Sequence, residues 1–243
     1  MTVTWILLIV IGYFFGSIPL SYILGKRRGV DLSKQGTHQV GAGNLWRITS
    51  RKLGFMVGFY DFLKGIIMII VAWRLGLDAG EQLVVGLAVI IGHNWPVFLA
   101  FHGGRGIATL LGLVVILPIL NDISPWPSVI AIAITLLFTV IYRSSPLPVL
   151  ISVISLPLTS RLFDSPVGVY TAYVAILLVV VIKRLTAQPA PEKLPISRVR
   201  LIVNRLFFDR DIADKHAWLH RPHFDEKEIL EYPAEDDEAD LKS

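Results

Sequence analysis

The stretch that decides the fold is GHNWPVFLAFHGGRGIAT, residues 92–109. It begins as the end of an apolar run, stops at Gly103-Gly104-Arg105-Gly106, and becomes apolar again at Ile107. Glycines can bring their backbone N–H groups close to an anion, and Arg105 adds a planar fork of donors at the start of a new helix. The stretch therefore indicates either a phosphate-binding turn or an ordinary turn between two helices that carries one arginine.

The whole chain is as apolar as this stretch. It has 243 residues, of which 53% are hydrophobic, and a mean hydropathy of +0.62. Because the apolar residues come in long blocks, we expect an all-α polytopic integral membrane helix bundle. The absence of cysteine excludes a disulfide framework and a thiolate metal site. No metal, other cofactor or nucleic-acid partner is expected.

The first apolar block, residues 5–25, is long enough to cross a bilayer and is followed by Lys26-Arg27-Arg28. In a signal peptide the charges would precede the apolar core. We therefore interpret this block as a retained span with its N-terminus outside the cell. Gly16-Ser17-Ile18-Pro19 interrupts the block, and such a small pair before a proline predicts a kink or a close helix contact.

Further apolar blocks predict about seven crossings, with five spans and re-entrant pieces as the alternative. The blocks are 55–73, 83–101, 107–120, 129–142, 147–158 and 167–182. Residues before Thr186 carry 14 Lys/Arg against 6 Asp/Glu, and the remainder carries 9 against 13. By the positive-inside rule, the basic loop 26–53, the turn at Gly103–Gly106 and the tail share the cytoplasmic face.

The loop 26–53 contains a second candidate anion site. Its middle, residues 36–47, mixes glycines with hydroxyl and amide donors, among them Thr37, Gly41 and Asn44, and ends on Arg47. The alternative is an ordinary polar loop with turn residues.

Three polar side chains within the apolar blocks are costly unless they are paired or face water. Asp61 and Lys64, three residues apart, form either a structural ion pair or a site where Lys64 reaches an anionic substrate. His93 lies in apolar surroundings before Pro96. It is either a hydrogen-bonded packing residue or part of the site.

These motifs together resemble one family. Residues 92–109 are similar to the Gly-His-x-x-Pro-(x)-Phe-Leu-x-Phe-x-Gly-Gly-Lys-Gly-x-Ala-Thr signature of the bacterial acyl-phosphate:glycerol-3-phosphate acyltransferases, usually called PlsY. Gly-Ser-Ile-Pro at 16–19, the loop 36–47 and Asp61-x-x-Lys64-Gly65 follow in the family's order, so the resemblance covers residues 12–185.

The resemblance implies a seven-helix enzyme of the bacterial inner membrane with its active site on the cytoplasmic face. It would transfer a fatty acyl group from acyl phosphate to the 1-hydroxyl of glycerol 3-phosphate, giving lysophosphatidate without a metal. Arg47 and Arg105 would be catalytic. Substrate phosphates would be held by Thr37, Gly41, Asn44, Lys64, His93, Gly103, Gly104, Gly106 and Thr109.

The sequence also departs from the family's pattern. Arg105 replaces a lysine, and Thr37, His38, Gln39 and Gly43 replace the family's Ser, Gly, Asn and Thr in the first loop. A third motif, His-x-x-Asn-Ile-x-Arg-Leu, keeps only its last residues, with Leu178 and Val181 where the His and Asn belong. This predicts an apolar patch that faces the phosphate pocket and weakens glycerol 3-phosphate binding.

Two other functions remain open: a non-catalytic paralogue that binds acyl phosphate or phospholipid, and a small transporter. A transporter should show inverted repeats, and none is visible in the sequence.

We divide the chain into a membrane domain, 1–185, and a cytoplasmic tail, 186–243. The tail should contain a linker at 189–195, an interfacial helix at 199–208 and an acidic disordered end from Glu235. His216, His220 and His223 suggest a metal site only weakly, because no cysteine supports them.

Overall fold

The computed structural model describes residues 2–186 and 196–219, and these residues form helices joined by short loops. The helices are α1 (Thr2–Gly16), α2 (Leu20–Arg27), α3 (Ala42–Ile48), α4 (Arg51–Arg74), α5 (Ala79–Asn94), the 3₁₀ helix η1 (Val97–Leu99), α6 (Ile107–Asn121), α7 (Trp126–Tyr142), α8 (Pro146–Leu162), α9 (Val167–Thr186), α10 (Arg198–Val203), the π-helix η2 (Asn204–Phe208) and α11 (Lys215–Leu219).

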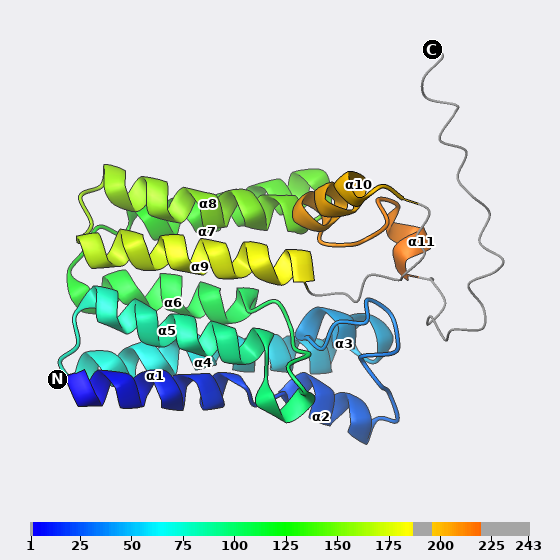
Figure 1. Ribbon diagram of the computed structural model, residues 1–243, viewed down its shortest axis with the longest axis horizontal. Coiled ribbons are helices and arrows are strands. Elements are labelled where there is room, and N and C mark those ends of the chain that lie inside the picture. Colours follow the sequence, from blue (N-terminus) through cyan, green and yellow to red (C-terminus); the bar gives the residue numbers. More distant parts are fainter. Residues whose placement is uncertain (1, 187–195, 220–243) are drawn as a thin grey trace, which may run out of the picture.

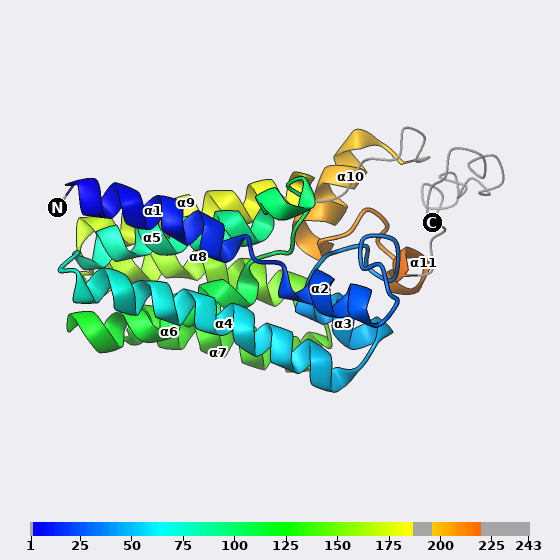
Figure 2. The same ribbon diagram turned by 90° about the horizontal axis from the view of Figure 1, so that it is seen from below.

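Among the described residues, the long helices α1 and α4 to α9 run side by side as one bundle (Figures 1 and 2). Within the described residues, four segments are long and apolar enough to cross a membrane: Thr2–Arg27, Arg51–Arg74, Ala79–Leu99 and Val167–Thr186. The helices α6, α7 and α8 are apolar but shorter, with 15 to 17 residues. The predicted all-α membrane bundle is confirmed.

The predicted interruption of the first span is confirmed as a break between α1 and α2. Ser17 is fully buried there, and its hydroxyl donates to the Tyr13 carbonyl oxygen (2.8 Å). The carbonyl groups of Gly16 and Ile18 lie at this break, and the Ile18 oxygen accepts a backbone bond from the Leu20 N–H (3.2 Å). They accept hydrogen bonds from Lys64 Nζ of α4 at 3.1 and 2.7 Å. A buried lysine therefore satisfies the backbone that the break exposes.

Glycines bring two helix pairs into backbone contact. A Cβ on Gly65 or Gly112 would overlap a carbonyl oxygen of the facing helix in the α4–α6 pair, and the same holds for Gly16 and Gly92 in the α1–α5 pair. Small residues allow such close approach in membranes, where packing rather than hydrophobicity drives helix association. The half of the bundle that carries both motif turns is therefore tightly fixed.

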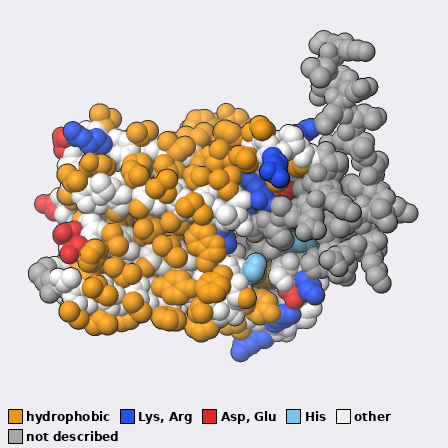
Figure 3. Space-filling view, in the orientation of Figure 1, with side chains coloured by type: hydrophobic (Ala, Val, Ile, Leu, Met, Phe, Trp, Pro, Cys, Tyr) orange, Lys and Arg blue, Asp and Glu red, His pale blue; other side chains and the backbone are white. Residues whose placement is uncertain are grey.

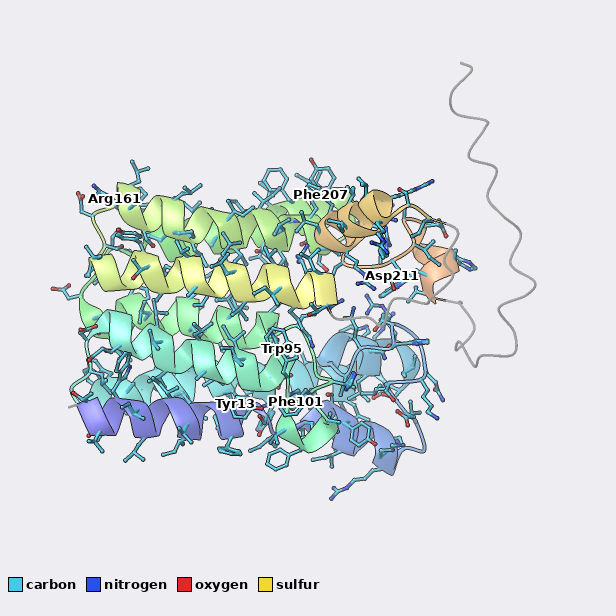
Figure 4. All side chains as sticks on the ribbon, viewed as in Figure 1. Tyr13, Trp95, Phe101, Arg161, Phe207 and Asp211 are labelled. Atoms are coloured by element: carbon cyan, nitrogen blue, oxygen red, sulfur yellow. The ribbon has the colours of Figure 1, made fainter. Side chains whose placement is uncertain are left out.

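The outer surface is apolar along the length of the bundle, and charged side chains gather at its two ends (Figure 3). The end with α2 and α3 carries most of the visible Lys and Arg, whereas the opposite end carries acidic side chains together with the basic Arg161 (Figures 3 and 4). The sidedness expected from the sequence stays a prediction.

Candidate active site

The two glycine-rich turns meet beside a cavity of about 690 Å³ at the end of the bundle that carries the basic residues. The loop before α4, the turn before α6, the ends of α7 to α9 and the C-terminal segment all contribute to its wall. The predicted site residues that line the cavity are Thr37, Gly41, Asn44, Arg47, His93, Gly104, Arg105 and Gly106.

The first turn is organised by Asn44, which is only 2% exposed. Its Nδ2 lies 2.9 to 3.1 Å from three backbone carbonyl oxygens of the loop, and its Oδ1 accepts a hydrogen bond from the Thr37 backbone N–H (2.9 Å). Because both polar atoms are used within the loop, Asn44 shapes the site rather than offering donors to a ligand.

Arg47 stands on the exposed side of α3 and lines the cavity. Its Nη1 donates to the Gly43 carbonyl oxygen one turn earlier (2.9 Å). Among the described residues Arg47 forms no ion pair, so most of its donors are available to an anion in the cavity.

The second turn folds back onto the end of α5. The backbone N–H groups of Gly103 and Gly104 donate to the carbonyl oxygens of Asn94 (3.2 Å) and His93 (3.1 Å). A Cβ on Gly104 would overlap the His93 ring, and Gly106 has a φ of +70°, which glycine adopts without strain. In this structure the N–H groups of Gly103 and Gly104 are therefore bonded to α5, and their role in phosphate binding stays a prediction.

The amide groups that remain for an anion come from α6. Its first turn begins at Ile107, and the first N–H groups of a helix have no partner within the helix. Gly106, Ile107 and Ala108 all line the cavity. The positive end of the α6 dipole therefore faces the space between the two turns.

Asp61, Lys64 and His93 form a polar cluster between α4 and α5. Lys64 Nζ lies 3.2 Å and His93 Nδ1 3.5 Å from Asp61 Oδ1. Asp61 and His93 line the cavity, whereas Lys64 is buried against the break in helix α1. Of the two predicted roles of Lys64, the structure supports the ion pair that holds the fold and not direct contact with a substrate.

Thr109 is another predicted binding residue that does not reach the cavity. Its side chain is fully buried, and its carbonyl oxygen lies against Gly65 of α4. Gly103 also does not line this cavity, and its backbone N–H donates to the Asn94 carbonyl oxygen. Both residues lie where they position the turn and α6, and their contact with a ligand stays a prediction.

Arg105 is held by a partner that sequence reasoning missed. Its Nε donates to Asp209 Oδ2 (2.9 Å), its Nη2 lies 2.9 Å from Asp209 Oδ1, and its Nη1 donates to the Lys183 carbonyl oxygen (3.2 Å). Asp209 follows η2 in the C-terminal segment. Burial raises the pKa of the Asp209 carboxyl group, although neighbouring Arg105 favours the charged form.

The last span turns its two basic residues inward. Lys183 Nζ donates to the Asn94 carbonyl oxygen, and Arg184 donates to the carbonyl oxygens of Leu206 and Pro146 (both 2.6 Å). Leu178 is 56% exposed, and neither Leu178 nor Val181 lines the cavity. The prediction of an apolar patch in the pocket is therefore wrong, because the side chains of Leu178 and Val181 lie on a part of α9 that does not line the cavity.

The C-terminal segment, residues 196–219, packs on the same end of the bundle (Figures 1 and 4). The predicted helix 199–208 is present as α10 followed by η2. Arg205 lies inside the segment, where its Nε donates to Asp211 Oδ1 (2.6 Å), whereas Phe207 lies at the outer edge (Figure 4). Phe208, Arg210 and Trp218 line the cavity.

Other predictions for the tail cannot be placed. The linker 189–195, His220, His223 and the acidic end from Glu235 lie outside the described residues. His216 is described, and no group of three His, Cys, Asp or Glu that could hold a metal ion occurs in the described ranges.

The chain is similar to known proteins over most of its length. Residues 6–188 match the family model for glycerol-3-phosphate acyltransferase. Glycerol-3-phosphate acyltransferase 4 of Dehalococcoides mccartyi (strain CBDB1) is 37% identical, and the match covers 95% of this chain and 99% of the relative. The enzyme of Trichlorobacter lovleyi (strain ATCC BAA-1151 / DSM 17278 / SZ) is 36% identical over 70% of this chain and 85% of the relative.

Solved structures give the same answer for the fold. PlsY (YgiH), an integral membrane glycerol 3-phosphate acyltransferase, matches in its glycerol 3-phosphate form with a TM-score of 0.67 and 32% sequence identity. The match covers 74% of this chain and 88% of that protein. The lysophosphatidic acid form matches with a TM-score of 0.64 and 31% identity.

Proposed function

This chain belongs to the glycerol-3-phosphate acyltransferase family, and we propose that it moves a fatty acyl group from acyl phosphate to the 1-hydroxyl of glycerol 3-phosphate. The observation that carries the proposal is that one cavity joins cationic groups to an apolar wall. Arg47, Arg105 and the start of α6 stand at its polar side, and Leu136, Val140 and Val149 at its apolar side.

Both substrates have the chemistry that such a cavity accommodates. Each carries a phosphate, and acyl phosphate also has a long apolar chain. A narrower space of about 70 Å³ between α6, α7 and α8 shares Ile107, Thr135 and Val149 with the main cavity. It supports a path for the acyl chain into the bundle, with the phosphate left at the cationic end.

The reaction needs little more than positioning. The glycerol oxygen attacks the acyl carbon, a new C–O ester bond forms, the bond from that carbon to the phosphate oxygen breaks, and the hydroxyl proton ends on the departing phosphate. Acyl phosphate is already activated, so proximity and neutralisation of the phosphate charges supply much of the rate. The products are lysophosphatidate and phosphate.

The distribution of charged residues also suggests on which face of the membrane the cavity lies. We propose a multi-pass protein of the bacterial inner membrane whose cavity and C-terminal tail, residues 186–243, face the cytoplasm. The basic residues at the cavity end support this sidedness. The apolar side chains of Val199 and Ile202 are exposed on α10, which supports contact of this helix with the membrane surface.

A single cysteine tests the sidedness, because the chain has none of its own. Gln35 is exposed in the loop beside the cavity, so Gln35→Cys should be protected from an impermeant thiol reagent added outside intact cells. It should react after the membrane is opened. Labelling from outside would place the cavity on the wrong face.

The activity itself is tested with purified protein in detergent, acyl phosphate and labelled glycerol 3-phosphate. We expect labelled lysophosphatidate with acyl phosphate as donor and none with acyl-CoA. Bound acyl phosphate without any product would instead favour the non-catalytic paralogue, whose supporting observation is that Arg105 is occupied by Asp209.

A further inference from the structure

We propose that the C-terminal segment is autoinhibitory: the Asp209 carboxylate occupies the place on Arg105 that a substrate phosphate takes during turnover. The inference rests on the proposed function, because it concerns the same cavity. It assigns residues 196–219 a regulatory task and predicts that substrate binding and release of this segment are coupled.

The first observation is that Asp209 holds the Nε and Nη2 side of the Arg105 guanidinium group. A guanidinium group carries five N–H bonds. Nε donates to Asp209 Oδ2, Nη2 donates to the Asp209 carbonyl oxygen and lies 2.9 Å from Asp209 Oδ1, and Nη1 donates to the Lys183 carbonyl oxygen. A phosphate can form the paired bonds that arginine favours only if Asp209 leaves.

The second observation is the balance of charge. Arg105, Arg184 and Arg210 all line the cavity, and Asp209 is the carboxylate that pairs with Arg105. A phosphate with two negative charges compensates three cations better than one carboxylate does. The same phosphate placed beside a retained Asp209 would be repelled. Exchange of one anion for the other is therefore favoured over binding of both.

The third observation is the way the segment is attached. Arg205 pairs with Asp211 and donates to the Leu185 carbonyl oxygen, and Arg184 donates to the carbonyl of Leu206. These bonds fasten η2 to the end of α9 without Asp209. Asp209 itself ends η2 with a φ of +57°, so it sits at a turn after the fastened part. Release of Asp209 needs a local change there and not loss of the whole segment.

The fourth observation separates regulation from a requirement of the reaction. The family model ends at residue 188, and the PlsY structures match 74% of this chain, whereas the Dehalococcoides relative matches 95%. A match of 95% leaves about 12 of the 243 residues uncovered, so it includes most of the region after residue 188. A contact made from this region is an addition in some family members and not a general need of acyl transfer.

The test compares wild type with Asp209→Asn in the full chain. Asparagine tolerates positive φ and keeps the size of the side chain while it removes the charge. We expect the KM for one phosphate substrate and the inhibition constant of inorganic phosphate to fall about tenfold, with kcat unchanged or raised. Separate titrations of glycerol 3-phosphate and acyl phosphate show which substrate replaces Asp209.

Asp214→Asn is the matched control, because it makes the same change of charge in the same segment. Asp214 accepts a hydrogen bond from the Ala217 backbone N–H before α11, and asparagine serves equally well there. Its KM values should equal those of wild type. A tenfold fall in this control as well would assign the effect to net charge and overturn the proposal.

Two results for Asp209→Asn would also overturn it. Unchanged KM values and phosphate inhibition would mean that Asp209 does not compete with substrate. A higher KM or a lost kcat would mean that Asp209 positions Arg105 for the reaction. If the variant does not fold, hydrogen exchange of the wild type decides: inorganic phosphate should accelerate exchange at residues 209–211, and unchanged exchange would refute the release.

The exchange measurement does not depend on turnover. Phosphate-dependent release in a protein without acyl transfer would leave the segment's role intact and remove the proposed activity. Acyl transfer without any competition between phosphate and Asp209 would keep the proposed activity and remove the autoinhibitory role of the segment.

Discussion

The two glycine-rich turns look alike in the sequence but use their residues in opposite ways. In the first turn the side chain of Asn44 forms its hydrogen bonds within the loop, and Arg47 lines the cavity with donors available to a ligand. In the second turn the backbone N–H groups of Gly103 and Gly104 donate to α5, and Arg105 forms an ion pair with Asp209. The difference teaches that a motif predicts where polar groups gather but not which of them are free.

The largest effect on acyl transfer is expected from replacing Arg105, the arginine that pairs with Asp209. Arg105→Ala removes a preorganised cation and leaves Asp209 buried without it, so kcat/KM for acyl transfer should fall at least about a hundredfold. Arg105→Lys keeps the charge and should retain much of the activity. Unchanged kinetics for both substrates in Arg105→Ala would remove Arg105 from the site.

The next effect concerns the asparagine that shapes the first turn. Asn44→Ala removes the side-chain bonds to three carbonyl oxygens and to the Thr37 N–H of the loop, and two of those oxygens keep a backbone donor, so the change should cost about 2 kcal/mol of unfolding free energy. Thermal unfolding in detergent measures this loss, and acyl transfer should fall with it. Gln82→Ala is the matched control, because Gln82 is a buried amide at the opposite end of the bundle. It should lower stability but leave the KM values intact.

A smaller effect on kinetics is expected from replacing Arg47, the arginine without an ion-pair partner among the described residues. Arg47 makes one hydrogen bond to its own helix, so Arg47→Ala should leave stability unchanged and raise the KM for a phosphate substrate about tenfold. Arg51→Ala removes a nearby exposed arginine that does not line the cavity, and its kinetics should match those of wild type. If the two variants behave alike, the first turn contributes shape and no charge.

The smallest effect concerns an ion pair beside the first turn. The pKa of Asp31 is lowered to about 2, first by the Lys26 ammonium group and then by Ser33. A lowered folded pKa stabilises the fold above the unfolded value near 4, and this contribution is lost as the pH falls towards 2. Because Lys26 is exposed, Asp31→Asn should cost less than about 1 kcal/mol at pH 7 in thermal unfolding. A larger loss would make this pair a main support of the loop.

Much of this arrangement follows from the sequence. Apolar blocks of membrane length predict the bundle, the Gly16-Ser17-Ile18-Pro19 sequence predicts the break, and the basic loops predict that both turns share one end. These signals are local or depend on composition, so one sequence carries them. The family resemblance then identifies the chemistry.

The contacts of single side chains could not be predicted in the same way. Asp209 lies 104 residues from Arg105, and nothing near it in the sequence marks it as a site residue. Motif position predicts that Leu178 and Val181 face the pocket, but in α9 Lys183 and Arg184 are buried while Leu178 is exposed. The sequence predicts that Gly103 and Gly104 donate to an anion, and it does not reveal the two carbonyl groups of α5 that accept these bonds once the turn folds back.

The bond between Lys64 and the break in the first span has a consequence for synthesis of the protein. A lysine within a span resists entry into lipid by about 2.5–3.5 kcal/mol, and free carbonyl groups at a broken helix resist it as well. In the finished protein each satisfies the other, because Lys64 Nζ donates to the carbonyls of Gly16 and Ile18. We therefore expect the first span to wait beside the translocon until the ribosome has delivered the second, and the two to enter the membrane as a pair.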